Sequence, residues 1–496
     1  MELQWKSAPC SYMRSMLRQV QNQEQTLELR LTDGMPDIGR VLCAWGQIQL
    51  RSKEWRTDTI HVGGGINVWA LYMPEDGTEP QCVEGWMPFQ GKWPLPEHSK
   101  EGVICADVAL RSLDGRTISP RKMLLRASVA LLAEAMEQQQ VAVYTPDELP
   151  EGVCLLKQSY PLQLLQEAGE KIFSVEQTLP LSGVMPKKIL ACNIVPLVTE
   201  QAVTAGRMVM RGHLEVNYVA LEENGHLYSN RLEMPFAQFA ELERDHDKEA
   251  SSTVTMALSD VTWMLEPEGL RVKCGLVAQY GIYAGCLLQV AEDAYSPKQS
   301  LVPKIEQLQM PVLLDRLHPQ MEADMELPIQ ARNVVDVVFS ADQPAQYREA
   351  DRLVVELPGV FQVLYYDQDD MLQCATRNWS GRWELPAGDN CCLRLGLRCC
   401  GASAVSVAAD RVNVIAHLQM DVQTCAEQQI PMVTGLQMGE RIAVDPKRPS
   451  LILRKSGGKS LWEIAKHCGS TVEAIQEANG LTSQPPAEQM LLIPVL

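Results

Sequence analysis

The stretch GGINVWALY, residues 64–72, contains the pattern that decides the fold. A glycine is followed by apolar residues at every second position, which is typical of a β-strand with one buried face. The same pattern returns in GHLEVNYVA at 212–220 and in GVFQVLYYD at 359–367. The leading glycines of the three stretches lie 148 and 147 residues apart. This spacing predicts three copies of one β-rich unit.

The sequence around each of these strands repeats with the same spacing. Each strand follows another strand-like run and leads into an acidic turn, which reads PEDG at 74–77, EENG at 222–225 and DQDD at 367–370. Met87 and Met234, in the matching stretches GWMPF and LEMPF, are also 147 residues apart. Solenoid repeats are only roughly 20 to 50 residues long. We therefore expect duplicated domains, each an antiparallel β-sandwich-like pair of sheets.

The end of the chain has a different pattern, GGKSLWEIAKHCGSTVEAIQEANGL at residues 457–481. Ser460 and Glu463 form a capping box, and the apolar residues that follow have helical spacing. Ser470 and Glu473 form a second capping box, and an Asn-Gly pair ends the second helix. A short strand precedes the first helix, and MLLIPVL supplies a closing strand. These signals predict a small βααβ domain.

The predicted fold class is therefore mainly β, with three duplicated antiparallel β-sandwich-like domains followed by one small βααβ domain. The domain limits rest on the repeat spacing and on the linker-like sequence KRP at 447–449. The predicted organisation is an N-terminal extension at 1–23, β domains at 24–172, 173–318 and 319–446, and the βααβ domain at 449–496.

The βααβ domain resembles the LysM domain. The family pattern is present as GKSLWEIA at 458–465, as NGL at 479–481 and as LLIP at 491–494. The resemblance implies a groove for N-acetylglucosamine polymers or for a protein partner, between the strand–helix loop and the loop after the second helix. The groove residues that it implies are Gly458, Lys459, Ser460, Leu461, Asn479, Gly480, Leu481 and Thr482. The expected core of the domain consists of Leu461, Trp462, Ile464, Ala465, Ile475 and Ile493.

Two residues of this domain affect the prediction of its ligand. Lys459 stands where the family usually has Asp or a similar polar residue, so the charge at the edge of the groove is reversed. Trp462 is expected to be a core aromatic residue rather than a platform for a sugar ring. Both expectations favour a protein partner over a glycan.

The three β units, with their strand framework and a Tyr-Ser-Pro turn at 295–297, are similar to the SPOCS domain. Tandem SPOCS domains followed by one LysM domain form the layout of SipL-type clostridial spore coat morphogenetic proteins. The resemblance implies a non-enzymatic scaffold in the mother cell at the forespore surface. Its LysM domain would dock the ATPase of the coat basement layer or another coat protein. Two alternatives stay open: LysM-mediated binding to peptidoglycan or spore cortex, and an enzyme anchored by its LysM domain.

Composition narrows the classes of partner and the compartment. The formal net charge is −18, which disfavours nucleic acid and anionic membrane surfaces as partners. No segment approaches the roughly 18 consecutive apolar residues of a membrane span, and the first residues lack the apolar run of a signal peptide. Fifteen irregularly spaced cysteines favour a reducing environment. We therefore expect a cytoplasmic protein.

Two stretches have the look of chemical sites. HVGGGIN at 61–67 is rich in glycine, but a strand follows it instead of the helix that a phosphate loop needs, so we expect a bulge or a tight strand entry. In CCLRLGLRCC at 391–400 the two cysteine pairs would lie roughly 26 Å apart along a strand, too far for one metal ion. We expect these thiols to pack in the strand. The sequence shows no catalytic constellation, and we expect no metal and no cofactor.

Overall fold

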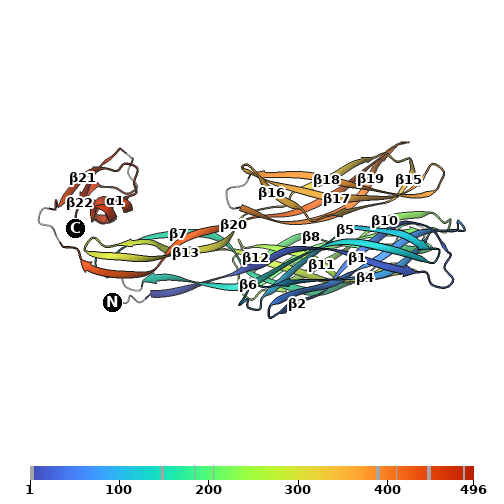
Figure 1. Cartoon of the computed structure of the whole chain (residues 1–496), viewed down its shortest axis with the longest axis horizontal. Helices are drawn as coiled ribbons and strands as arrows, with labels where there is room; N and C mark the ends of the chain where they lie inside the picture. Colours follow the sequence, from blue (N-terminus) through green and yellow to red (C-terminus); the bar gives the residue numbers. More distant parts are fainter. Residues whose placement is uncertain are drawn as a thin grey trace.

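The computed structural model describes residues 5–146, 150–183, 185–204, 206–386, 391–408, 410–443, 448–483, 486 and 488–496. The predicted domain limit at 446 and the first four residues of the N-terminal extension lie outside these ranges. The described chain is mainly β, with antiparallel sheets and a small domain with two helices at the C-terminal end, as the sequence predicts (Figure 1).

Strand pairing divides the β part into three units. Unit 1 contains β1 (Trp5–Arg30), β2 (Ile38–Arg56), β3 (Thr59–Pro74), β4 (Gln81–Pro94), β5 (Val103–Ser119) and β6 (Lys122–Pro146). Unit 2 contains β7 (Cys154–Leu179), β8 (Lys188–Thr204), β9 (Arg207–Leu221), β10 (Leu227–Glu241), β11 (Ser251–Glu266) and β12 (Gly269–Tyr295). Unit 3 contains β13 (Gln299–Leu317), β14 (Gln320–Leu327), β15 (Ala331–Ala341), β16 (Ala345–Glu349), β17 (Arg352–Asp367), β18 (Leu372–Pro386), β19 (Cys391–Val407) and β20 (Val412–Arg441).

The three units have the same topology. In unit 1 one sheet has the order β2-β3-β4 and the other β1-β6-β5, and unit 2 repeats this as β8-β9-β10 and β7-β12-β11. Unit 3 follows the same plan with β15-β17-β18 and with β20 between β19 and the pair β13 and β14. The added elements of unit 3 are the short β16 and the break between β13 and β14. Shared topology over the whole unit supports the duplication that the sequence predicts.

The domain limits themselves stay a proposal. The first and last long strands of each unit pair with each other, which groups residues 5–146, 154–295 and 299–441. This pairing favours limits about twenty residues earlier than the predicted starts at 24, 173 and 319. The physical reason is that the repeated sequence landmarks lie on the second and later strands, whereas the first strand of each unit carries only a weak pattern.

The three repeated glycines lie inside strands β3, β9 and β17, each beneath an aromatic ring. A Cβ atom would come within 2.8 Å of the Phe89 ring at Gly64, 2.9 Å of the Phe236 ring at Gly212 and 2.2 Å of the Phe339 ring at Gly359. Opposite the glycines of HVGGGIN, the ladder between β2 and β3 shifts register between Leu50 and Ser52. The extra residue, Arg51, lies on β2, so the bulge faces the glycine stretch instead of lying within it, and the glycines themselves lie inside β3.

Apolar side chains fill the space between the two sheets of each unit. Ile66 and Leu125 are fully buried in unit 1, Val216 and Leu276 in unit 2, and Val363 in unit 3. A further apolar cluster joins the outer faces of all three units. Its buried members include Trp45, Trp69, Leu71, Leu190, Val219, Leu221, Val335, Leu364 and Tyr366. The three units therefore share a core and pack as one body.

The long strands of each unit extend beyond the sandwich as a two-stranded ribbon. Each ribbon begins at a bulge in the first strand, between Ser15 and Leu17, between Leu165 and Glu167, and between Leu313 and Asp315. The stalk consists of these ribbons, namely residues 5–15 with 136–146, 154–165 with 283–295, and 299–313 with 425–441. The apolar faces of the ribbons meet in a buried cluster that contains Tyr12, Val143, Leu164, Val290, Met310 and Ile430. Figure 1 shows the stalk extending from the body toward both chain ends.

Candidate functional site

The C-terminal domain contains a two-stranded sheet and two short helices. Its elements are β21 (Leu451–Lys455), α1 (Leu461–Cys468), α2 (Val472–Asn479) and β22 (Met490–Pro494), with β21 antiparallel to β22. Each helix is only eight residues long. In the described part of the chain no helix is therefore long enough to cross a membrane.

One of the two predicted helix caps is correct. Ser460 caps α1, its side chain accepts from the backbone of Glu463, and the Glu463 carboxylate accepts from the backbone of Ser460 in return. The second capping box is wrong. Thr471 caps α2 by accepting from Ala474 N at 3.1 Å, and Ser470 is fully buried before the cap. Ser470 still belongs to the end of α1, because its backbone nitrogen donates to Ala465 O, so the following residue, Thr471, caps α2.

The structure places the residues predicted for the core of this domain in two groups. Buried side chains around the two helices and β22 include Leu461, Ile464, Ala465, Ile475 and Ile493. Trp462 is only partly buried, at the edge of this cluster. Trp462 lies outside the centre of the domain because its indole ring contacts strand β12 of unit 2.

The residues predicted for the groove differ in exposure. Exposed members are Gly458, Lys459, Gly480 and Thr482, whereas Ser460, Asn479 and Leu481 are partly buried and Leu461 is buried. The side chain of Asn479 is engaged inside the domain, because it donates to Leu492 O at 2.6 Å and accepts from Leu492 N at 2.7 Å. Asn479 therefore fastens α2 to β22, and the exposed residues of the two loops are Gly458, Lys459, Gly480 and Thr482.

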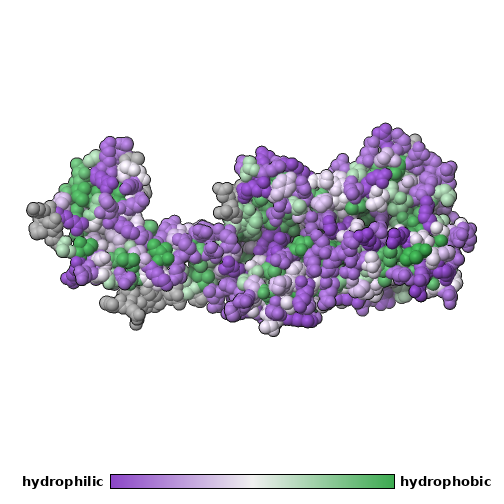
Figure 2. All heavy atoms as spheres, viewed as in Figure 1, coloured by the Kyte–Doolittle hydropathy of each residue, from purple (hydrophilic) through white to green (hydrophobic). Residues whose placement is uncertain are grey.

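The outer face of the small sheet exposes apolar side chains. Leu451, Leu453 and Met490 are 48%, 65% and 46% exposed, and they share the face that points away from Leu491 and Ile493. Figure 2 shows hydrophobic residues on the surface of this domain, amid a largely hydrophilic molecule. Such a face is typical of a protein contact site.

The opposite side of the domain docks on the tip of the stalk. Lys466 of α1 pairs with Asp293 of β12 through Nζ–Oδ distances of 2.7 and 2.9 Å, and the indole nitrogen of Trp462 donates to the same carboxylate at 2.9 Å. The Trp462 ring packs edge-on against Tyr295, with ring centroids 4.7 Å apart. The Tyr295 hydroxyl donates to the carbonyl oxygen of Ser470 at 3.0 Å. These contacts hold the C-terminal domain against unit 2.

The electrostatics of this contact fit a structural role. Partial burial alone would raise the pKa of Asp293, but the hydrogen bonds from Lys466 and Trp462 outweigh it and lower the pKa below its ordinary value. Burial raises the pKa of the Tyr295 hydroxyl, which therefore stays a hydrogen-bond donor. Sequence reasoning missed this contact. The only available signals were the unusual Tyr-Ser-Pro turn and a tryptophan next to a basic residue on α1.

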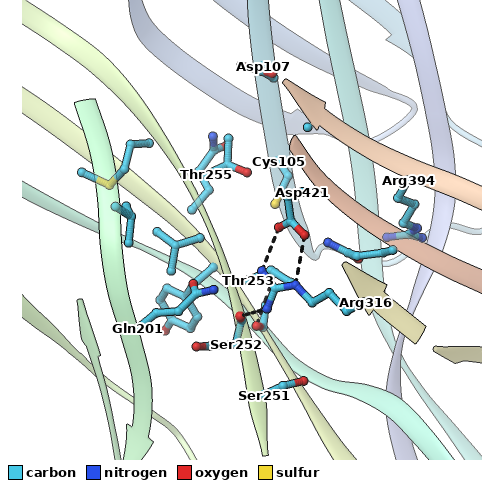
Figure 3. Close-up of a pocket in the computed structure, with 18 of the residues that line it drawn as sticks. Cys105, Asp107, Gln201, Ser251, Ser252, Thr253, Thr255, Arg316, Arg394 and Asp421 are labelled. Atoms are coloured by element: carbon cyan, nitrogen blue, oxygen red, sulfur yellow. Dashed lines mark hydrogen bonds and ion pairs between the residues drawn. The ribbon is translucent and has the colours of Figure 1, made fainter. Parts of the chain in front are cut away.

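A cavity of about 860 Å³ lies where the three units meet. Unit 1 lines it with Cys105 and Asp107, unit 2 with Gln201 and the start of β11 at 251–256, and unit 3 with side chains of β13, β19 and β20 (Figure 3). Burial raises the pKa of the Cys105 thiol to about 12, so this thiol is not a nucleophile. Residues of β8 and β11 also line the cavity. Both are edge strands, because each pairs with a neighbouring strand on one side only.

The arginines of the cavity are paired with carboxylates. Arg316 binds both oxygens of Asp421 at 3.0 and 2.8 Å and also donates to the carbonyl of Ser252. Across units, Arg398 of β19 binds both oxygens of Asp107 at 2.9 and 3.1 Å. Arg394 reaches Glu134 of unit 1 at 2.9 Å. The ion pairs of Arg398 and Arg394 therefore link unit 3 to unit 1, and the hydrogen bond from Arg316 to Ser252 links unit 3 to unit 2.

In the described residues, no three His, Cys, Asp or Glu side chains come together as a metal site. His246 and Glu167 form a pair at 3.1 Å, but both side chains are buried away from solvent. The CCLRLGLRCC stretch forms part of β19 as predicted, and Cys391 and Cys399 pack against apolar clusters.

These features define a multi-unit β protein that carries a small ligand-binding module at the tip of a stalk. The family model of the LysM domain matches residues 458–494, so the C-terminal module is a LysM domain. LysM domains are binding modules and not catalytic ones. Neither the curated proteins nor the solved structures contain a match to this chain.

Proposed function

We propose that this protein is a non-enzymatic adaptor in spore coat assembly and that its LysM domain attaches it to a protein of the coat basement layer. The LysM match supports a binding role for the C-terminal domain. The role in coat assembly rests on the resemblance of the three β units to SPOCS domains in their sequence pattern. The observation that carries it is the placement of the LysM domain. One side docks on the stalk through Asp293 and Tyr295, and the loops of the groove and the outer sheet face stay exposed.

The exposed sheet face favours a protein over a glycan as the attached partner. A glycan that lies against the loops at 458–461 and 479–482 would leave Leu451, Leu453 and Met490 in water. A protein surface with its own apolar patch would bury these side chains and gain roughly 25 cal/mol for each Å² of apolar area removed from water. The partner that fits is a coat protein, with the basement-layer ATPase as the first candidate.

The three units suit the role of a scaffold. They share a core at the body and at the stalk, so surfaces on different units are held at fixed distances. An adaptor with several fixed contact surfaces binds an assembling layer with higher avidity than its single contacts provide. The units therefore offer further sites for coat proteins while the LysM domain anchors one end.

A second candidate function is binding to peptidoglycan or spore cortex. The family match favours it, because N-acetylglucosamine polymers are the ligands associated with LysM domains. The open backbone edges at Gly458 and Gly480 leave room for a sugar chain. This candidate uses the groove and not the apolar sheet face, so substitutions separate the two functions.

The test compares two variants of the full chain. Leu453→Lys places a charge on the exposed sheet face, and Thr482→Arg places a bulky side chain at the groove. Each chain is incubated with purified peptidoglycan in a sedimentation assay and with the purified basement-layer ATPase in a capture assay. The proposal predicts capture of the ATPase by the wild type, loss of capture in Leu453→Lys and no sedimentation with peptidoglycan.

The opposite pattern supports the second candidate. Sedimentation of the wild type with peptidoglycan, its loss in Thr482→Arg and no capture of the ATPase would overturn the adaptor proposal. Both positions are exposed, so thermal unfolding of the variants should match the wild type and serves as the control for folding.

A further inference from the structure

Two cysteines from different units face each other inside the stalk. Cys10 lies on β1 of unit 1 and Cys286 on β12 of unit 2, and their sulfur atoms are 3.6 Å apart. The two residues are 276 positions apart in the sequence, so only the packing of the ribbons brings them together. Both side chains are partly buried and pack against the apolar cluster of the stalk.

The ribbons hold both residues in place. Cys10 is paired with Val141 in the ladder of unit 1, and Cys286 is paired with Leu162 in the ladder of unit 2. A disulfide has a sulfur–sulfur distance of roughly 2.0 Å. The two sulfurs must approach from 3.6 Å to this distance for a disulfide to form.

The chemistry of this pair differs from that of the buried cysteines. Burial raises the pKa of Cys82 and of Cys274 to about 12, so those thiols stay protonated. Cys10 and Cys286 share one hydrogen bond between their thiols. This hydrogen bond lowers the pKa of Cys286 to about 7 and raises the pKa of Cys10. Thiolates react and thiols do not, so we take Cys286 as the attacking sulfur.

We propose that Cys10 and Cys286 are a modification site, where a hydroperoxide oxidises the pair to an intramolecular disulfide that fastens unit 1 to unit 2 in the stalk. The Cys286 thiolate attacks one oxygen of hydrogen peroxide, the O–O bond breaks, and Cys286 becomes a sulfenic acid while the other oxygen leaves as hydroxide, which takes up a proton to become water. The Cys10 sulfur then attacks the Cys286 sulfur, the S–O bond breaks, and the proton of Cys10 leaves with the hydroxide as a second water. Two thiols are oxidised and one peroxide is reduced to two waters.

The cross-link would act on the part of the stalk that carries the LysM domain. Asp293 and Tyr295, which hold that domain, follow Cys286 on the same strand β12. Oxidation therefore ties the N-terminal strand to the strand on which the LysM domain docks. A disulfide that closes a long loop stabilises the folded chain mainly by restricting the unfolded one.

The test maps disulfides in the full chain after treatment with hydrogen peroxide. Trypsin releases Cys10 in the peptide 7–14 and Cys286 in the peptide 274–298, which also contains Cys274. Mass spectrometry should detect these two peptides linked, with the loss of two hydrogens, and a reductant should separate them. Cys286→Ser should abolish the link, whereas Cys274→Ser, on the same peptide, should keep it.

A second readout follows the acidity of Cys286. Because the hydrogen bond between the two thiols lowers the pKa of Cys286, its thiolate fraction and hence the rate of cross-linking should rise as the pH is raised toward neutrality. In Cys10→Ser, a sulfenic-acid probe should label Cys286. The proposal is overturned if peroxide yields no link between the two peptides in the wild type, or if the link persists in Cys286→Ser.

Discussion

Asp293 accepts hydrogen bonds from Lys466 and Trp462 of α1, and together with Tyr295 it holds the LysM domain on the stalk. Asp293→Ala removes the acceptor for Lys466 and Trp462, and we expect the contact to weaken while the domain remains folded. Hydrogen exchange should become faster at 461–470 and at 290–295. The control is His467→Ala, at an exposed position next to Lys466, which should leave exchange unchanged. Unchanged exchange in Asp293→Ala would show that the contact does not hold the domain.

The same carboxylate predicts how the docking responds to pH. The pKa of Asp293 is lower in the folded chain than its ordinary value of 3.8, so its contribution is present above that value. The contribution is lost as the pH falls through the folded pKa. We expect lower protection at the LysM contact in acid in the wild type, with exchange rates taken relative to those of unstructured amides at the same pH, and no such step in Asp293→Asn.

Asp336 accepts a hydrogen bond from the indole of Trp45 at 3.0 Å across units 1 and 3. Burial raises the pKa of Asp336 above its ordinary value, so the folded state favours the protonated carboxyl. Its contribution to stability is present below the ordinary pKa and is lost as the pH rises through the pKa of the folded state. Asp336→Asn keeps an acceptor without the charge and should equal or exceed the wild type in stability at pH 7. Asp336→Ala leaves the indole unpaired and should cost about 1–3 kcal/mol in unfolding free energy. Equal stability of the two variants would contradict this assignment.

At the residue scale, the sequence predicts contacts between residues that are close together in the chain. Ser460 and Glu463 are three positions apart, so their capping box is readable from the sequence. Trp462 is different, because its partners Asp293 and Tyr295 lie on another domain and no local pattern points to them. The error at Ser470 has a local origin, because Ser470 N donates to Ala465 O at the end of α1 and the next residue, Thr471, caps α2.

At the scale of strands, each unit contains one repeated glycine that lies beneath an aromatic ring. Gly212 of β9 lies where a Cβ would come within 2.0 Å of the carbonyl oxygen of Leu197 and 2.9 Å of the Phe236 ring. Gly212→Ala should destabilise the chain by about 1–3 kcal/mol, because the clash with the backbone can be relieved only by moving the strand. At Gly396 of β19 an added Cβ would have no atom closer than 3.7 Å, so Gly396→Ala is the matched control. Similar unfolding free energies for both variants would contradict the account.

The strands are predictable where one face is buried and alternation is strong, as in GHLEVNYVA of β9. The ribbons are not predictable in the same way. The stalk part of β1 contains polar residues on both faces, and only the partner ribbons give Tyr12 its burial. The bulges that mark the start of each ribbon also leave no local signal, because they are defined by the pairing with a distant strand.

At the scale of the whole molecule, ion pairs between units hold the body around the cavity. Arg398 and Asp107 join unit 3 to unit 1, and we expect the two single alanine variants and the double variant to show a coupling of about 0.5–3 kcal/mol. The exposed pair Arg211 and Glu200 within unit 2 is the control and should show at most about 1 kcal/mol. Denaturant unfolding measures both. A coupling at Arg398 no larger than that of the control would mean that the cavity pairs do not join the units.

The duplication itself was readable from spacing, but the arrangement of the units was not. Residues such as Trp45, Leu190 and Leu364 look like ordinary strand residues, and only the structure shows that they form one cluster across three units. The same holds for Cys10 and Cys286, which no spacing rule connects. Contacts between duplicated units depend on their relative placement, which a repeat pattern does not specify.

The central claim is that the folded LysM domain attaches this protein to the coat basement layer. The most direct measurement is the affinity of the full chain for the purified basement-layer ATPase, with and without Ile464→Asp. Ile464 is 1% exposed, so a charge there should unfold the LysM domain, while the body, which has its own core, remains folded. We predict nanomolar-to-micromolar binding by the wild type and none by the variant. Equal binding by both, or none by the wild type, would contradict the claim.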